Sequence, residues 1–177
     1  HPRFPQQQKI KAVKPLLSEV IDAVEIQAKT KQKNPLFYNI ETKTQPQTDG
    51  VFHPEPKEFV ELLMKVILQK NIEARVIIQS FDRRTLQYLH QKYPTIATAL
   101  LVEDFDEKEF KNQIADLGFL PSIYSPAQEL VTQKLIQECH QNNVKLIPWT
   151  VNDATKIKEF IAMGVDGIIS DYPNLFD

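Results

Sequence analysis

A short polar face in the segment FYNIETK, at residues 37–43, is the feature of this chain most suited to chemistry. The segment is predicted to form a strand, in which successive side chains alternate between two faces. Asn39, Glu41 and Lys43 then share one face, so that an acid and a base lie side by side at the end of a strand. This pattern favours chemistry over packing, whereas the alternative is a solvated strand face with a weak ion pair.

The composition sets the class of protein and excludes several partners. The chain has 177 residues, of which 42% are hydrophobic and 25% charged, and a formal net charge of −2. This is the composition of a globular protein, and we predict a single domain over residues 1–177 with a loop at 1–13. The near-neutral charge gives no electrostatic reason to expect nucleic acid or an anionic membrane as a partner. No apolar run approaches the roughly 20 residues of a membrane span.

The single cysteine, Cys139, rules out a disulfide within the chain. It lies in a segment with a helical pattern, so we predict a buried structural thiol. One cysteine says little about the redox compartment. A cytoplasmic location and a periplasmic or secreted location therefore stay open as alternatives.

The elements that must position Glu41 and Lys43 follow a regular alternation of strand and helix. Helices are predicted between successive strands and before the first one, from the spacing of their apolar residues. Asp82 and Asp153 are placed to cap helices, and Gly118 and Gly164 lie where helices should end. Such βαβ units predict a parallel sheet. The predicted strands are residues 37–43, 74–81, 97–102, 120–125, 145–151 and 166–170.

Two α/β architectures fit this alternation, an open doubly wound sheet and part of a (β/α)8 barrel. No glycine-rich phosphate loop follows any strand, and the chain has only 4 glycines. This weighs against a nucleotide-binding open sheet. A barrel has eight strands and typically about 250 residues, whereas about six strands are predicted here. We therefore predict a TIM (β/α)8 barrel that lacks about its first two βα units.

Four segments, taken in order, resemble the glycerophosphodiester phosphodiesterase family, and HPEPKEF at 53–59 resembles a further family segment. The resemblance covers the chain from about Leu16 to Phe176 and implies a (β/α)8 barrel. It also implies a hydrolase that uses a divalent metal, Ca²⁺ or Mg²⁺, to cleave a glycerophosphodiester such as glycerophosphocholine into glycerol 3-phosphate and an alcohol. The four segments are NIETK at 39–43, IIQSFD at 77–82, PWTVND at 148–153 and GVDGIISDYP at 164–173.

The resemblance assigns roles to the polar face of residues 39–43. Glu41 matches the third metal carboxylate of the family, and Lys43 matches the basic residue that contacts the phosphate. Inward-pointing residues at the carboxyl ends of barrel strands line the active site, which predicts that Gln79 and Phe81 bind substrate. Trp149 is predicted to form a wall of the pocket that contacts the glycerol or the alcohol group. The alternative for these last three residues is a structural role in the core.

The chain departs from the family pattern in one respect. The family begins with a strand carrying His-Arg-Gly, then a strand with Glu-x-Asp and a His-Asp pair, and none of these occurs here. These motifs hold both catalytic histidines and two of the three metal carboxylates, and none of the four histidines of this chain matches them. We therefore expect a further N-terminal segment of the same protein, and little activity from these residues alone.

Two other functions stay open beside this one. A non-catalytic barrel fragment or binding module would keep the scaffold without the chemistry, in agreement with the missing histidine motifs. A related phospholipase D-like barrel enzyme would apply the same metal chemistry to sphingolipids. The sequence leaves the alcohol head group, the physiological metal and the oligomeric state undetermined.

Overall fold

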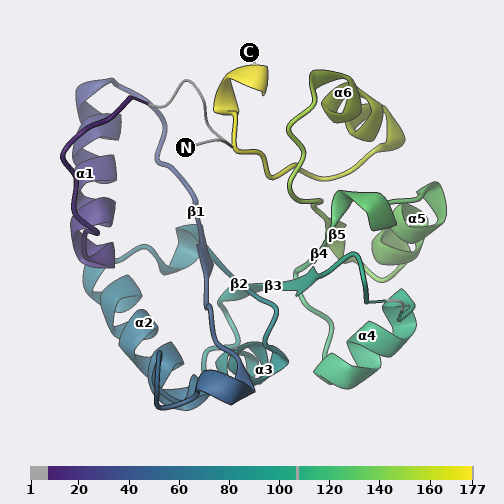
Figure 1. The fold of residues 1–177 in the computed structure, drawn as a ribbon, viewed down its shortest axis with the longest axis horizontal. Coiled ribbons are helices and arrows are strands. Elements are labelled where there is room, and N and C mark those ends of the chain that lie inside the picture. The colour runs from purple at the N-terminus through teal and green to yellow at the C-terminus, as the bar shows by residue number, and fades with distance from the viewer. Residues whose placement is uncertain (1–7, 107, 177) are drawn as a thin grey trace. The chain divides into compact units, whose positions relative to one another are not determined.

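The structure is a computed structural model that describes residues 8–106 and 108–176 (Figure 1). The chain forms two compact units, at residues 1–36 and 37–177. The sequence-based interpretation of the whole chain as one domain stays a prediction.

Within its described residues, 8–36, the first unit contains one helix, α1, at Leu17–Thr30. Ile21 is buried, and Glu19 accepts a hydrogen bond from the backbone N–H of Leu16 at 2.9 Å, which satisfies one free amide at the start of the helix. Residues 8–13 of the predicted loop have no regular secondary structure, and residues 1–7 of it lie outside the described residues.

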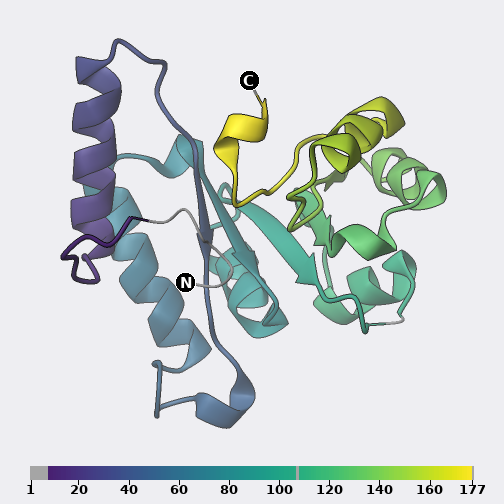
Figure 2. The same cartoon turned by 45° about the horizontal axis from the view of Figure 1, so that its top comes forward.

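The second unit is built on a five-stranded sheet in the order β1-β2-β3-β4-β5 (Figures 1 and 2). All four neighbouring pairs are parallel, as the alternation of strand and helix predicts. Strand β3 is apolar and buried after its first residue, whereas buried and half-buried residues alternate along β2, with Gln79 among the half-buried ones. The strands are β1 Tyr38–Glu41, β2 Val76–Ser80, β3 Ala97–Val102, β4 Ile123–Pro126 and β5 Lys145–Leu146.

Five helices connect or follow these strands, and α2, α3, α4 and α5 follow one another along one side of the sheet (Figure 1). Short 3-10 helices precede β2 and follow β1, β4 and the last helix. The positions of the α-helices between successive strands agree with the predicted βαβ units. The helices are α2 Pro56–Lys70, α3 Arg83–Lys92, α4 Phe110–Leu117, α5 Gln133–Gln141 and α6 Ala154–Met163.

The predicted helix boundaries are confirmed by their caps. Asp82 accepts a hydrogen bond from the backbone N–H of Arg84 at 3.0 Å, and Asp153 accepts one from Lys156 at 2.9 Å. Gly118 and Gly164 end α4 and α6 in the left-handed region, at φ +83° and +90°. Glycine adopts this conformation without steric cost, so local sequence alone located these four helix ends.

The predicted strand at 166–170 is wrong, and the strand predicted at 145–151 is reduced to Lys145–Leu146. Backbone hydrogen bonds still join the two segments, from Asp166 to Leu146 and from Ile169 to Pro148, each at 2.9 Å. Pro148 has no N–H to donate, so a regular ladder is interrupted there. The last segment therefore lies beside the chain that follows β5 without forming a strand.

Cys139 is fully buried in α5, as predicted. Burial, together with the nearby negative charges of Glu138 and Asp166, raises the pKa of the thiol to about 12. Because the thiolate is the reactive species, we expect iodoacetamide at pH 8 to label the native protein far more slowly than the protein in denaturant. Mass spectrometry of timed samples measures this, and equal labelling rates in the two states would contradict the buried thiol.

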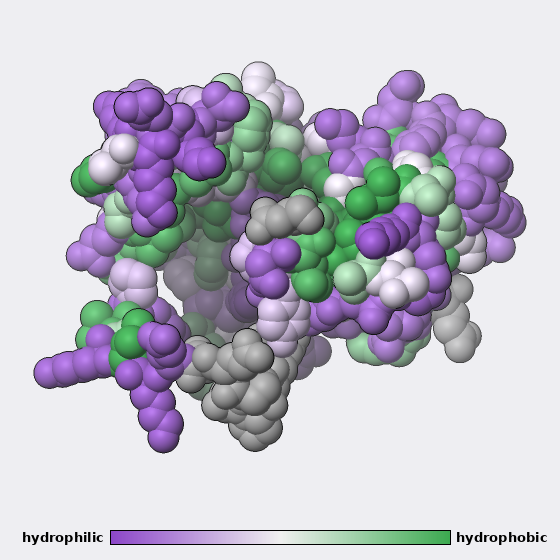
Figure 3. Space-filling view, turned by 90° about the horizontal axis from the view of Figure 1, so that it is seen from above, coloured by the Kyte–Doolittle hydropathy of each residue, from purple (hydrophilic) through white to green (hydrophobic). Residues whose placement is uncertain are grey.

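Several large apolar side chains remain exposed in the second unit, among them Val51, Phe52 and Phe105 in loops that follow strands. Figure 3 shows one face of the molecule, on part of which apolar side chains gather beside polar ones. Among the described residues, no helix combines the length and the apolar character that crossing a membrane requires.

Candidate functional site

The register of the sheet brings two of the predicted site residues together. Glu41 is paired with Gln79 across β1 and β2, and Gln79 is paired with Ala99 across β2 and β3. Paired residues of parallel strands point to the same side, so all three lie on one face of the sheet. The side chain of Asn39 donates a hydrogen bond to Gln79 at 2.7 Å on this same face. The predicted polar face of β1 therefore continues onto β2.

Phe81 and Trp149 meet on this face, although they follow strands that are not neighbours. Their ring centroids are 5.4 Å apart, with an angle of 85° between the rings. Because β3 and β4 lie between β2 and β5, such a contact requires the sheet to curve, with the two rings on its concave face. Trp149 also donates a hydrogen bond to the carbonyl of Ser125 at 2.9 Å. Phe81 remains 36% exposed, so the aromatic pair presents an accessible apolar wall.

Lys43 lies just beyond β1, because this strand ends at Glu41 and is shorter than predicted. The ammonium group of Lys43 is 2.7 Å from a carboxylate oxygen of Glu41, and the two side chains are 77% and 20% exposed. An ion pair with one exposed partner contributes little, about 0–1 kcal/mol. The pair therefore presents a partly buried carboxylate and an exposed lysine. An anionic ligand that binds this lysine in place of Glu41 would break an ion pair of little free energy.

Glu103 is a further acidic residue of this face that the sequence analysis missed. It follows β3 directly, and the alternation through Ala99 and Leu101 puts it on the same face as Gln79. Burial and the negative charges of Asp104 and Glu41 raise the pKa of its carboxyl group. The predicted strand at 97–102 ends one residue before Glu103, so no role was predicted for this residue. The informative signal is a carboxylate immediately after a buried apolar strand.

The fit of this face to a divalent metal is only partial. Ca²⁺ and Mg²⁺ take six or more oxygen ligands, among which several come from protein carboxylates in a tight site. Across residues 8–106 and 108–176, no three His, Cys, Asp or Glu residues are grouped so that they could hold a metal ion. Glu41, with Glu103, supplies at most part of such a shell, and the sequence-based metal assignment stays a prediction.

The described histidines make local contacts. His90 stacks on Phe119 with ring centroids 3.9 Å apart, and His140 pairs with Asp166 at 2.8 Å. His53 hydrogen-bonds to Thr48 at 2.8 Å within the loop after β1. His1 lies outside the described residues. These contacts give each of the three described histidines a local structural partner.

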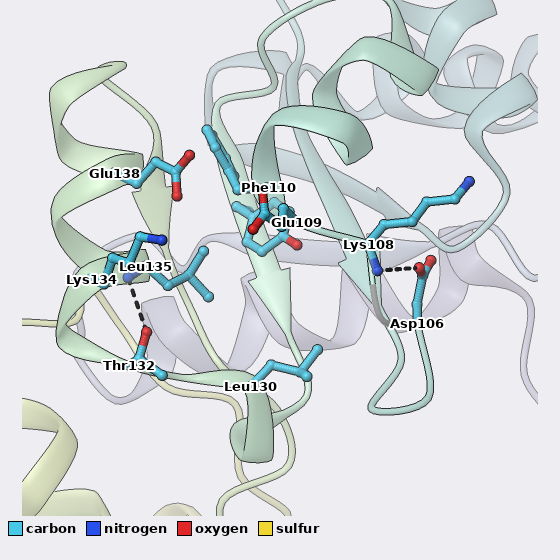
Figure 4. Close-up of a pocket in the computed structure, with 10 residues that line it drawn as sticks. Asp106, Lys108, Glu109, Phe110, Leu130, Thr132, Lys134, Leu135 and Glu138 are labelled. Atoms are coloured by element: carbon cyan, nitrogen blue, oxygen red, sulfur yellow. Dashed lines mark hydrogen bonds between the residues drawn. The ribbon is translucent and has the colours of Figure 1, made fainter.

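A cavity of about 200 Å³ lies elsewhere, between the start of α4 and α5 (Figure 4). The hydrogen bonds drawn there are local, from the backbone of Lys108 to Asp106 at 3.2 Å and from the backbone of Leu135 to Thr132 at 3.1 Å. None of the five predicted site residues is among those that line this cavity. The candidate site is therefore the concave face of the sheet and not this cavity.

The fold and the face together define the class of protein. A parallel α/β sheet that carries acidic, basic and aromatic side chains at the carboxyl ends of its strands agrees with a TIM-barrel-type fold, whose active sites lie at that end. The chain belongs to the glycerophosphoryl diester phosphodiesterase family, whose sequence model matches residues 3–175. The family resemblance of the four motifs is thereby confirmed.

Two curated relatives and two solved structures illustrate the relationship. A glycerophosphodiester phosphodiesterase of Bacillus altitudinis is 29% identical over 162 residues, which cover 90% of this chain and 60% of the relative. One from Caldanaerobacter subterraneus subsp. tengcongensis is 33% identical over 115 residues, covering 64% and 45% of the two chains. The present chain thus spans about half of the length of these relatives.

Among solved structures, a putative glycerophosphoryl diester phosphodiesterase from Silicibacter pomeroyi DSS-3 has a TM-score of 0.80 and 26% identity, covering 98% of this chain and 59% of that one. An Oleispira antarctica phosphodiesterase, in complex with the product sn-glycerol-3-phosphate, has a TM-score of 0.71 and 18% identity, covering 90% and 58%. The second likeness supports the fold alone.

Proposed function

We propose that the complete protein hydrolyses glycerophosphodiesters to glycerol 3-phosphate and an alcohol, in a reaction that depends on Ca²⁺ or Mg²⁺. The observation that carries this proposal is the concave face, on which the Glu41–Lys43 pair and the Phe81–Trp149 pair belong to one curved sheet. The relatives named glycerophosphodiester phosphodiesterases support the same reaction class. Because this chain spans about half of their length, the activity is assigned to the complete polypeptide.

Three polar residues of the face have roles in this proposal. Lys43 acts as a point charge on the phosphodiester, whose negative charge increases in the transition state. Glu41 offers one carboxylate to the divalent metal, which when bound would neutralise phosphate charge. Gln79, with its amide already hydrogen-bonded to Asn39, offers polar contacts to the substrate.

The proposal places the general acid and base outside this face. The two histidines that the family resemblance implies would come from polypeptide beyond these 177 residues, as would the remaining metal carboxylates. The same polypeptide would complete a barrel of which the five described strands form part. The length of the relatives supports this arrangement, since each extends well beyond the region matched by this chain.

The direct test is release of glycerol 3-phosphate from glycerophosphocholine by the complete polypeptide, with Ca²⁺, with Mg²⁺ and with a chelator. We expect release with one or both metals and none with the chelator. Release of choline from sphingomyelin by the same preparation distinguishes the related phospholipase reaction. Failure to release glycerol 3-phosphate under every metal condition would contradict the proposal and favour the binding-module alternative.

The aromatic wall leads to a prediction about substrate binding. Phe81→Ala removes the ring that packs against Trp149, so the alcohol or glycerol group loses an apolar contact. We expect KM for glycerophosphocholine to rise about tenfold, the equivalent of about 1.4 kcal/mol, with a smaller change in kcat. Phe105→Ala, which alters a highly exposed ring in the loop after β3, is the control and should leave KM unchanged. Equal KM values for wild type and Phe81→Ala would remove Phe81 from the substrate pocket.

A further inference from the structure

The two faces of the segment at 41–44 differ in burial and in their contacts. Glu41 and Lys43 lie on the concave face, whereas Thr42 and Thr44, which alternate with them, are both buried. A buried hydroxyl needs a hydrogen-bond partner, so the contacts of the two threonines show what holds this segment in place.

Thr42 is held by the neighbouring strand and by the helix that follows it. Its backbone N–H donates to the carbonyl of Gln79 at 3.0 Å, and its own carbonyl accepts from the hydroxyl of Ser80 at 2.9 Å. Its hydroxyl is 2.9 Å from the hydroxyl of Thr85, at the start of α3. The backbone between Glu41 and Lys43 is therefore fixed to β2 and α3.

Thr44 is held through a carboxylate that also binds an arginine. Its hydroxyl donates to Asp82 Oδ2 at 2.9 Å, and Arg84 donates to the same carboxylate from Nε at 3.0 Å and from Nη2 at 2.7 Å. Burial acts to raise the pKa of Asp82, but the hydrogen bonds from Arg84 and Thr44 outweigh it and lower the pKa. Asp82 is thus an ionised link between Thr44 and Arg84.

Arg84 also reaches the loop that leads from Lys43 to α2. Its Nη1 donates to Asp49 Oδ2 at 2.5 Å and its Nη2 to Asp49 Oδ1 at 3.1 Å. The hydrogen bond from Arg84 lowers the pKa of Asp49. One planar guanidinium therefore binds two carboxylates in a fork geometry. One is Asp49 in the loop after Lys43, and the other is Asp82, which also accepts the hydrogen bond from Thr44.

We propose that Arg84 is a positioning residue for Lys43: by binding Asp82 and Asp49 together, it fixes the backbone from which the lysine side chain reaches the substrate. This proposal rests on the proposed function of Lys43 as the phosphate contact. The lysine side chain itself is exposed and flexible, so its backbone anchor sets where the ammonium group lies. A displacement of about 1 Å in a reacting group costs up to about a hundredfold in rate.

Arg84→Lys in the complete polypeptide is the primary test. Lysine keeps the positive charge but cannot bind two carboxylates through a planar fork. We expect kcat for glycerophosphocholine to fall about tenfold, which is within the loss of up to about a hundredfold that a displacement of about 1 Å causes. Arg83→Lys is the matched control, because this adjacent arginine contacts Gln113 and Asp106 and not the loop after β1. It should leave kcat within about twofold of wild type.

A double-mutant cycle with Lys43→Met separates positioning from a general structural role. If Arg84 acts through Lys43, Arg84→Lys should lower kcat about tenfold in the wild type and less than about twofold in the Lys43→Met background. A purely structural loss would lower kcat by the same factor in both backgrounds, and this result would overturn the proposal. If Arg84→Lys does not fold, Thr44→Val removes one hydrogen bond of the same network and should show the same dependence on Lys43 with a smaller factor.

Hydrogen exchange of backbone amides tests the anchoring by Arg84 without any measurement of activity. We expect Arg84→Lys to increase the exchange rate of backbone amides in residues 42–50 at least about tenfold, with no change in the α6 peptide. Unchanged exchange in residues 42–50 would overturn the positioning role even if the enzyme is active. If the complete wild-type polypeptide hydrolyses no glycerophosphodiester, the proposed function fails, whereas the exchange measurement still accepts or rejects the anchoring by Arg84.

Discussion

Glu41→Gln is expected to lower kcat/KM of the complete polypeptide for glycerophosphocholine at least about a hundredfold, and to raise the Ca²⁺ or Mg²⁺ concentration needed for half-maximal rate. The substitution keeps the size of the side chain but removes the negative charge that a divalent cation requires. Because Glu41 is partly buried beside Lys43, the neutral amide also leaves the lysine without its ionic partner. Initial rates over a range of metal concentrations measure both effects.

The control for Glu41→Gln is Glu159→Gln. Glu159 forms an ion pair with Lys156 at 3.0 Å on the surface of α6, so the same chemical change is made in a pair away from the concave face. This variant should keep the metal dependence of wild type. A metal requirement that is identical in Glu41→Gln and wild type would show that Glu41 is not a ligand, whatever the change in rate.

Lys43→Met is expected to lower kcat about 10²–10³-fold, the scale found when one donor to a developing negative charge is removed. Methionine keeps an unbranched side chain of similar reach, so the loss reports on charge. Since the Glu41–Lys43 pair has one highly exposed partner, we expect little change in stability, about 0–1 kcal/mol. Steady-state kinetics and thermal unfolding of the same preparation separate the two quantities.

Lys156→Met is the matched control for Lys43→Met, since Lys156 is the basic partner of the comparable surface pair on α6. We expect its kcat to equal that of wild type. Lys43→Arg should recover part of the activity, because a guanidinium restores the charge with a different shape. A kcat for Lys43→Met within about threefold of wild type would exclude a phosphate contact in the transition state.

Local patterns predicted much of the fold. The five strands, the caps at Asp82 and Asp153 and the helix ends at Gly118 and Gly164 depend on residue type and short-range periodicity, and all are found near their predicted positions. The strand predicted at 166–170 failed because an apolar β-branched run indicates a strand but does not determine whether its neighbour can form a ladder. Here the neighbour contains Pro148, which lacks a donor.

The site was predictable to the extent that it follows the alternation of a single strand. Glu41 and Lys43 could be placed on one face from FYNIETK alone, and their ion pair agrees with that placement. Glu103 directly follows a predicted strand, which is a local signal, but that it shares a face with Gln79 depends on the register of β3 against β2. The contact of Gln79 with Asn39 likewise required the pairing of β1 with β2.

By itself, the sequence determined the parallel α/β class, the family and the shared face of Glu41 and Lys43, because these follow from periodicity and from ordered motifs along the chain. Only the tertiary structure decided that Phe81 meets Trp149 and that Arg84 joins Asp82 to Asp49. The physical reason is that these contacts depend on the curvature of the sheet and on the path of a long loop. Both are set by packing among segments far apart in the chain.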